Sequence, residues 1–396
     1  MVNQLPQGWK EEELGKLADV IAGQSPEGIY YNTVGDGTPF YQGKSEFQEM
    51  YLGKPTKWTT KVTKLAKRND ILMSVRAPVG PVNITQEDIC IGRGLAAITA
   101  KSMLLQLYLF YHLRYLEDKI SGTNGAVFAS ISKREIEQIK ITYPTDKDEQ
   151  QYIVKTLDAV AEMIKLRKET IKLTKDLIPA IFQEMFGDFR GDEPIKKHVI
   201  VNPPKASLNN NEKVSFLSMA DVSVDGYISS SQRRCYSDVR NGFSSFINDD
   251  IILAKITPCY ENGKGAIVRD LINGIGFGST EFYVLRCDKQ YILPEYLFYL
   301  LRSDDFMELG KCHMKGAAGQ KRLDKLFLQN FGITYPSLSQ QKEFAKKVEQ
   351  INKYIVAQQE ELEHFETLFQ SLLQEAFTGV LTWNYPRKEC HDKKDK

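Results

Sequence analysis

One short string in the chain comes close to a catalytic motif. NPPK at Asn202–Lys205 has the Asn-Pro-Pro core of adenine methyltransferases, in which a following Tyr or Phe stacks on a flipped base. Here the fourth residue is Lys205, and no glycine-rich cofactor loop follows a strand nearby. Because proline pins extended backbone, NPPK is better explained as a rigid lead-in to the second half of the chain.

Other reactive residue types are also poorly placed for catalysis. A nuclease site needs several carboxylates and a lysine around a metal, and the pair Asp249–Asp250 has a counterpart at Asn69–Asp70, which favours a structural turn. The six cysteines are scattered without a CxxC pair, so free thiols in a reducing cytosol are expected. Cys312–His313 and Cys390–His391 are only weak hints of a metal. We therefore predict no catalytic residue, no metal site and no cofactor in this chain.

Basic residues concentrate in one stretch although the net charge is only +1. Lys54–Arg68 contains six Lys or Arg residues, Trp58 and no acidic residue. Such a stripe can follow a phosphate backbone, and a simple solvated face would have the same composition. The chain has 42% hydrophobic residues and neither a run of ~18 apolar residues nor a secretory signal, so a globular cytoplasmic protein is predicted.

Much of the remaining sequence pattern occurs in two copies. ITYP stands at Ile141–Pro144 and again at Ile333–Pro336, and each copy is preceded by a similar run, YLFYHLR at Tyr108–Arg114 and YLFYLLR at Tyr296–Arg302. Short β-rich runs and polar turns precede each ITYP, and the YLFY runs have the pattern of amphipathic helices. We therefore predict a duplicated α+β globular block.

A long charged segment follows each ITYP and carries an apolar heptad pattern, which is typical of a coiled coil. The predicted seam residues are Leu157, Val160, Ile164, Ile171 and Ile178, followed by Val348, Ile351, Ile355, Leu362 and Phe369. Antiparallel pairing is predicted because a globular block separates the two segments. Arg167 and Gln358 occupy the same seam position, where they either fix the register or mark an opening. Pro179 predicts a kink or break near Leu177.

Several longer motifs belong together. They are LPQGW (Leu5–Trp9), ILMSVRAPVGPVNI (Ile71–Ile84), ICIGRGLAAI (Ile89–Ile98), KVSFLSMADVSVDGYI (Lys213–Ile228), KITPCYENGKGAI (Lys255–Ile267), GSTEFYVLR (Gly278–Arg286) and the pair Glu149–Gln150 after Pro144. With these motifs the chain resembles the specificity subunits of type I restriction–modification systems, up to about Leu381. The second copy departs from the pattern, since Gln340–Gln341 follows Pro336.

The resemblance implies a DNA-recognition subunit without catalytic activity. In this family two target recognition domains each read half of a split site on double-stranded DNA, and conserved helices set the gap. Modification (methyltransferase) subunits dock on those helices, and restriction (motor-nuclease) subunits join the assembly. S-adenosylmethionine, ATP and Mg would then belong to the partners. Because the two blocks differ outside the shared frame, an asymmetric target is expected.

The implied domain boundaries follow the duplication. They are 1–145 for the first target recognition domain, 146–187 for the central conserved helix, 188–337 for the second recognition domain, 338–380 for the distal conserved helix and 381–396 for a tail. A different class of function also fits the residues, namely a coiled-coil scaffold protein without sequence-specific DNA binding.

Candidate DNA contacts follow from side-chain type, since Arg and Lys pair with guanine edges and Gln or Asn with adenine. The loop GAAGQKR (Gly316–Arg322) is the most exposed-looking, and GTNGAVF (Gly122–Phe128) is its counterpart. The candidates are Gln24, Ser25, Lys44, Lys57, Arg76 and Arg93 in the first block and Arg233, Arg234, Lys255, Lys264, Lys315, Gln320, Lys321 and Arg322 in the second.

Overall fold

The computed structural model describes residues 5–121, 130–187, 189–317 and 319–381. The chain divides into two compact units, unit 1 with residues 1–168 and 361–396 and unit 2 with residues 169–360. Each unit contains a globular block and a part of both long helices, α5 (Lys147–Phe186) and α10 (Leu338–Thr378). No helix in the described ranges is long and apolar enough to cross a membrane. The five boundaries drawn from the sequence stay predictions.

The globular block of unit 1 combines short strands with short helices. The strands are β1 (Trp9–Glu13), β2 (Ala18–Ala22), β3 (Tyr31–Asn32), β4 (Thr38–Tyr41), β5 (Trp58–Thr59), β6 (Leu65–Ala66), β7 (Ile71–Ser74), β8 (Val82–Ile84), β9 (Ile89–Ile91), β10 (Leu95–Ala100) and β11 (Lys140–Pro144). The helices are α1 (Leu14–Leu17), η1 (Gly28–Tyr30), η2 (Lys44–Glu46), α2 (Gln106–Tyr115), α3 (Glu117–Ser121) and α4 (Lys133–Glu137). One sheet has the strand order β2-β10-β7-β8, another has β3-β5-β4-β9-β6, and β1 pairs with β11.

The globular block of unit 2 is built in the same way. Its strands are β12 (Arg190–Pro194), β13 (Val199–Val201), β14 (Lys213–Leu217), β15 (Gln232–Cys235), β16 (Ser244–Ile247), β17 (Ile251–Ala254), β18 (Gly265–Ile267), β19 (Ile275–Gly278), β20 (Phe282–Cys287), β21 (Met314–Lys315), β22 (Arg322–Leu323) and β23 (Gly332–Ile333). Its helices are η3 (Ile195–Lys197), α6 (Tyr236–Val239), η4 (Ile272–Gly274), α7 (Pro294–Leu300), α8 (Asp304–Cys312) and α9 (Lys325–Asn330).

The strand orders of unit 2 repeat those of unit 1. The order β13-β20-β17-β18 matches β2-β10-β7-β8, and β15-β14-β19-β16 matches β5-β4-β9-β6. The matched pairs β4–β9 and β14–β19 are both parallel, whereas their neighbours in these sheets are antiparallel. The predicted duplication of a mixed helix-and-sheet block is therefore confirmed.

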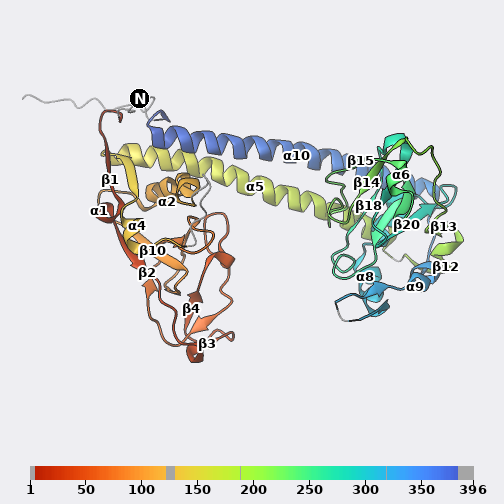
Figure 1. The fold of residues 1–396 in the computed structure, drawn as a ribbon, viewed down its shortest axis with the longest axis horizontal. Coiled ribbons are helices and arrows are strands. Elements are labelled where there is room, and N and C mark those ends of the chain that lie inside the picture. The colour runs from red at the N-terminus through yellow and green to blue at the C-terminus, as the bar shows by residue number, and fades with distance from the viewer. Residues whose placement is uncertain (1–4, 122–129, 188, 318, 382–396) are drawn as a thin grey trace, which may run out of the picture. The chain divides into compact units, whose positions relative to one another are not determined.

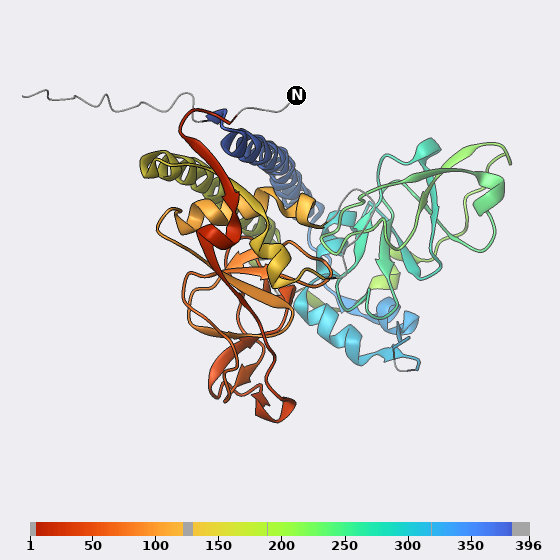
Figure 2. The same cartoon turned by 60° about the vertical axis from the view of Figure 1, so that its left-hand side comes forward.

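In unit 1, helix α2 lies between the first sheet and the long helices (Figures 1 and 2). Tyr108, Leu109 and Leu113 of α2 belong to one buried cluster with strand residues, with Leu157 of α5 and with Phe369 of α10. The predicted helix over the YLFYHLR run is thus confirmed, and its apolar faces are covered on both sides. In unit 2, α7 is the corresponding helix, and its Tyr296 packs against Phe186 of α5 at 4.9 Å.

The repeated ITYP is explained by the hydrogen bonds that its backbone makes. The Tyr108 hydroxyl of α2 donates to the Thr142 carbonyl at 2.9 Å. In unit 2 the Tyr296 hydroxyl donates to the Thr334 carbonyl at 3.0 Å. Because the buried tyrosine hydroxyl needs an acceptor, this bond fixes each YLFY run to its own ITYP segment.

A buried glutamine joins each ITYP to its long helix. Gln150 in unit 1 accepts a hydrogen bond from the Leu105 N–H and donates to the Met103 and Pro144 carbonyls. Its counterpart Gln341 in unit 2 makes the same three bonds. It accepts from the N–H of Leu293 and donates to the carbonyls of Tyr291 and Pro336. Both side chains are fully buried. We call this arrangement the glutamine clamp.

The clamp also accounts for the different starts of the long helices. α5 begins three residues after Pro144, and α10 begins two residues after Pro336. The extra residue in the first copy is taken up in the connection, because Gln150 and Gln341 reach equivalent partners. The family-like pair Glu149–Gln150 therefore has a structural basis in its second member.

Parts of α5 and α10 pack on each other within each unit (Figure 1). The predicted seam residues Leu157, Val160, Ile164, Leu362 and Phe369 all contribute to the core of unit 1, and Ile178, Val348 and Ile351 contribute to that of unit 2. Ile171 and Ile355 are also buried. Arg167 forms an ion pair with Glu361 at 2.5 Å, so this polar seam residue is matched by a carboxylate.

Of the kink or break predicted near Leu177, the break is wrong, and the kink stays a prediction. Helix α5 runs without interruption from Lys147 to Phe186 and has Pro179 inside it. Proline inside a helix costs about 3 kcal/mol. Ile178, Phe182 and Phe186 are buried in the core of unit 2, and burial of three such side chains outweighs that cost at roughly 1.5–3 kcal/mol each.

His112 is a buried titratable residue at the position where the second copy has Leu300. Its Nε2 accepts a hydrogen bond from the Thr142 N–H at 3.2 Å, and its ring packs against Phe377 at 4.6 Å. Burial lowers the pKa of His112 to about 3. A histidine in the unfolded chain binds a proton near pH 6.5, so the stabilising effect of the neutral ring is complete above that pH and is lost as the pH falls toward 3.

We expect His112→Leu to make the protein less sensitive to acid. In the unchanged protein each pH unit below 6.5 costs up to about 1.4 kcal/mol through this residue, and the variant lacks that loss. At pH 7.5 the variant should be less stable by about 1 kcal/mol because the Thr142 N–H loses its acceptor. Urea unfolding at pH 7.5 and 5.0 measures both effects. The exposed His313→Leu is the control, and equal acid losses in all three proteins would contradict the prediction.

Candidate nucleic-acid interface

In unit 2, several of the predicted DNA contacts come from two loops that lie side by side. The loop after β17 starts at Lys255, and the loop between β21 and β22 ends at Lys321, directly before Arg322 of β22. The Thr257 N–H donates to the Lys321 carbonyl at 2.9 Å, and the Leu323 N–H donates to the Lys255 carbonyl at 2.8 Å. The structure thereby brings together five of the candidates, namely Lys255, Lys315, Gln320, Lys321 and Arg322.

These five side chains differ in how far they are already engaged. Arg322 donates two hydrogen bonds to Glu281, at 2.9 and 2.8 Å, and this contact raises the pKa of its guanidinium. Lys315 is paired with Asp324, and burial lowers the pKa of Lys255, which lies 5.2 Å over the Tyr283 ring. Arg322 and Lys315 therefore hold the loops in shape.

The remaining members of this group are Gln320 and Lys321. Both are exposed, and their side chains form no hydrogen bond or ion pair with the residues that the structure describes. An amide and an ammonium group next to each other at a loop tip can bind adenine and guanine edges, respectively. These two are the strongest base-reading candidates of unit 2.

The other candidates of unit 2 lie apart from this group or are engaged elsewhere. The Lys264 ammonium donates to the Met219 carbonyl at 2.9 Å. Arg234 on β15 stacks 3.7 Å over Phe216 and donates to the Gln232 side chain. Only Arg233, beside it, is exposed. A base-reading role for Arg234 would require the loss of its contacts to Phe216 and Gln232.

In unit 1, three candidates meet at the end of β2. The Arg93 N–H donates to the Ser25 hydroxyl at 3.2 Å, and the Gln24 N–H donates to the Ile91 carbonyl at 3.0 Å. The Arg93 and Gln24 side chains are exposed. A Cβ on the neighbouring Gly94 would lie 2.3 Å from the Gln42 carbonyl, so glycine is needed there for the two segments to approach.

The other candidates of unit 1 are less closely connected. Lys44 follows Gln42 at the start of η2, Lys57 lies beside β5, and Arg76 follows β7, all with exposed side chains. The Arg76 backbone pairs with Ser130, as Ile256 pairs with Arg322 in unit 2. The loop Gly122–Phe128 lies outside the described residues. All six basic residues of Lys54–Arg68 are exposed, which fits both a phosphate-binding stripe and a solvated face.

Sequence reasoning missed Gln42, which the structure places next to Arg93 and Ser25. The Gly92 position shows this, because a Cβ there would lie 3.0 Å from both Gln42 Cα and the Ser25 hydroxyl. The signal was present in GRGLAAI, whose glycines indicate close approach of another backbone segment. Nothing in the sequence identified which segment that was.

The strings that could suggest chemistry have structural roles. Asn202 of NPPK adopts a left-handed conformation with φ +57° and accepts the Val284 N–H, and Lys205 donates to the Arg240 carbonyl. Asp250 forms a two-bond pair with Arg286, and Asp249 has φ +68°, as its counterpart Asn69 has φ +73°. Among the described residues, no group of three or more His, Cys, Asp or Glu side chains could hold a metal ion.

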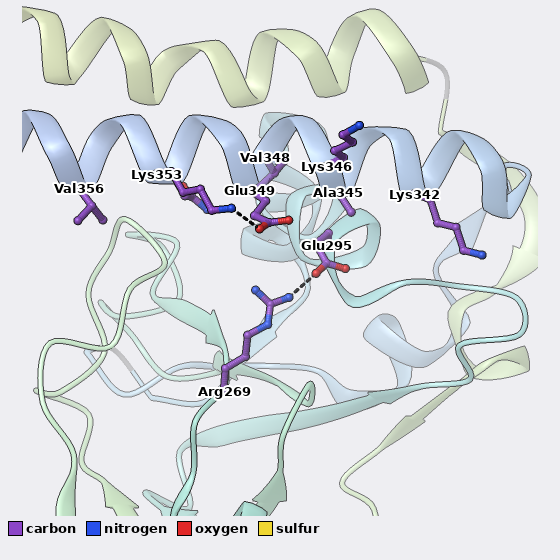
Figure 3. Close-up of a pocket in the computed structure, with 10 residues that line it drawn as sticks. Arg269, Glu295, Lys342, Ala345, Lys346, Val348, Glu349, Lys353 and Val356 are labelled. Carbon is purple, nitrogen blue, oxygen red and sulfur yellow. Dashed lines mark hydrogen bonds and ion pairs between the residues drawn. The ribbon is translucent and has the colours of Figure 1, made fainter.

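A groove of about 730 Å³ runs along α10 in unit 2 (Figure 3). Figure 3 shows Arg269 and Glu295 pointing toward each other and Glu349 pairing with Lys353 along α10, the latter at 2.7 Å. The groove is thus bordered by four basic and two acidic side chains, and both acidic ones are already paired with a basic one. Its polar groups do not converge on one point, as they would in a small-molecule site.

Comparison with known proteins identifies the family of this duplicated architecture. A family model described as the type I restriction modification DNA specificity domain matches residues 6–175 and 202–366. The chain belongs to this family. The two matched regions contain most of both globular blocks and most of both long helices, so the resemblance noted in the sequence is confirmed.

Individual members of the family are similar over different shares of the chain. A protein described as the MjaX type I restriction enzyme specificity subunit, from Methanocaldococcus jannaschii, is 43% identical over 44% of this chain and 42% of its own length. The EcoAI specificity subunit from Escherichia coli is 38% identical over 36% of this chain and 24% of its own length. The chain therefore matches less than half of either relative.

A third comparison extends over the whole chain. The solved S subunit of a type I restriction–modification system from M. genitalium is 14% identical and covers 95% of this chain and 98% of its own, with a TM-score of 0.51. At this identity the likeness shows the fold. The two repeated mixed helix-and-sheet domains of this chain therefore have the same fold as that solved S subunit.

Proposed function

We propose that this chain is the sequence-specific DNA-recognition subunit of a type I restriction–modification complex. One observation carries the proposal: the two units repeat the same sheets and the same glutamine clamp, whereas the Gly316–Arg322 loop and its counterpart Gly122–Phe128 differ in sequence. A duplicated architecture with different polar loops fits two recognition domains that bind two different half-sites. The family comparisons support this assignment and disfavour the scaffold alternative.

We assign a role to each part of the chain according to the family resemblance. Residues 1–145 and 188–337 act as recognition domains, and residues 146–187 and 338–380 act as conserved helices that pair as one antiparallel coiled coil. The seam residues packed inside units 1 and 2 support the pairing, and both α5 and α10 continue from one unit into the other. The helices set the gap between half-sites and dock modification and restriction subunits. Catalysis, with S-adenosylmethionine, ATP and Mg, belongs to those partners in the cytoplasm.

The test is methylation by the reconstituted complex. With its modification subunits and S-adenosylmethionine, the chain should direct methylation to a split site whose two halves differ, because the Gly316–Arg322 loop and its counterpart Gly122–Phe128 share little sequence. The chain alone should transfer no methyl group. Sequencing of methylated bases in genomic DNA measures both. A palindromic motif would contradict the asymmetry, and methylation without sequence preference would support the scaffold alternative.

A further inference from the structure

Each recognition domain contacts its long helices at a second place, far in sequence from the glutamine clamp. The contact is made by the connection between β4 and β5 in unit 1 and by the matching connection between β14 and β15 in unit 2. We call residues 48–52 and 222–228 the helix-docking loops. Their sequences, QEMYL and VSVDGYI, are unrelated.

In unit 1 the docking loop is held by a lysine of α5. The Lys168 ammonium lies 2.6 Å from a Glu49 carboxylate oxygen and 3.0 Å from one of Glu366 on α10. Partial burial lowers the pKa of Lys168, but the hydrogen bonds to Glu49 and Glu366 raise it above the usual value. One lysine therefore joins the loop to both long helices.

An arginine at the end of α2 holds the same loop from the other side. Arg114 donates to the Glu49 carbonyl at 3.2 Å, and its guanidinium stacks 5.1 Å over the Phe369 ring of α10. The loop is thus bound through its side chain by α5 and through its backbone by α2. These contacts join the second sheet of unit 1 to the helix pair.

Unit 2 makes the same connections with different loop residues. The Lys175 ammonium of α5 lies 2.5 Å from an Asp225 carboxylate oxygen, and the Tyr227 hydroxyl donates to Asn352 of α10 at 2.9 Å. Arg302, the counterpart of Arg114, donates to the Val224 carbonyl at 2.8 Å. The arrangement of a lysine, a loop carboxylate and an arginine on a loop carbonyl is thereby repeated.

The repetition in unrelated loop sequences indicates a need beyond stability. Ion pairs with side chains as exposed as Lys168 (42%) and Glu49 (48%) contribute little to folding. The clamp and the apolar contacts of α2 or α7 attach each domain to the helices along one side, and a second, distant contact restricts rotation about that side. The loop contact therefore fixes the angle between each recognition domain and its own helices.

We propose that Lys168 with Glu49 and Glu366, and Lys175 with Asp225, are positioning residues that make the complex selective for one gap length. The proposal rests on the proposed function. A recognition domain that can swing on its helices reaches half-sites at more than one distance, whereas a fixed domain reaches one. The bases read within each half-site depend on the loop tips, so they do not change.

The experiment compares Lys168→Ala and Lys175→Ala with the control Lys172→Ala. Lys172 is an exposed lysine of the same helix. Each chain is assembled with modification subunits and offered DNA whose half-sites are constant while the gap varies by one base pair in each direction. We expect the first two variants to methylate the altered gaps about threefold to fivefold more, relative to the native gap, than the control does. Their unfolding midpoints and their half-site bases should stay unchanged.

A charge exchange provides the second measurement. Lys175→Asp combined with Asp225→Lys should restore the native gap selectivity that Lys175→Asp alone loses, because the ion pair is rebuilt in the opposite direction. Unchanged gap selectivity in the alanine variants, altered half-site bases, or no restoration by the exchange would overturn the proposal. If the unchanged complex methylates without a gapped target at all, the proposed function itself fails, which this design separates from a failure of the positioning role.

Discussion

Replacing Gln150 or Gln341 by leucine is expected to lower the free energy of unfolding of the affected unit by about 3 kcal/mol. Leucine has a similar size but makes none of the three hydrogen bonds, so one N–H and two carbonyls, among them the buried Pro144 carbonyl, lose their partner within the core. An unpaired buried polar group costs roughly 1–3 kcal/mol. Because the same bonds occur in both copies, the two substitutions should have similar effects.

Hydrogen exchange of the full-length chain measures this prediction, since it reports on the two units separately. Gln150→Leu should increase exchange in unit 1 and Gln341→Leu in unit 2. The exposed neighbours Gln151→Leu and Lys342→Leu are matched controls and should change little. If the clamp variants behaved like these controls, the hydrogen bonds would not be what joins ITYP to the long helix.

The repeated architecture was predictable because its sequence motifs occur in both halves of the chain. ITYP, the YLFY runs and the heptads stand in similar order in both halves, and a shared pattern separates constrained positions from free ones. The glutamine clamp could have been anticipated from Gln150 and Gln341, which keep nearly the same distance from the preceding proline. Two of its three partners could not, because they are backbone atoms of a segment about 45 to 50 residues earlier in the chain.

The candidate site was less predictable because spatial context determines which charged side chains are free. Arg322 and Lys321 are neighbours in sequence, yet Arg322 is bound to Glu281, 41 positions away, while Lys321 is exposed. Pro179 shows the same limit for helices, since packing of Phe182 and Phe186 overrides a local breaking signal. Long-range contacts of this kind leave no pattern in a single sequence.

Lengthening the paired helices is expected to lengthen the gap between the half-sites. Four residues inserted after Lys168 in α5 and four after Glu360 in α10 would add about 6 Å at 1.5 Å per residue, with a rotation of only ~40°. A four-residue stutter is tolerated in coiled coils, so the variant should fold. At ~3.4 Å per base pair the gap should grow by about two base pairs. An insertion in α5 alone between Leu157 and Ile178 should act in the same direction but slip the seam, and a deletion should shorten the gap.

The most direct test of the helices as the spacer between half-sites is therefore the methylated motif of this double-insertion variant. It is read by sequencing genomic DNA from cells that contain the variant and its modification subunits. We predict two unchanged half-sites separated by a longer gap. If the recognised bases changed while the gap kept its length, the helices would not be the spacer. The division of the chain into two recognition domains and a helical spacer would then be wrong.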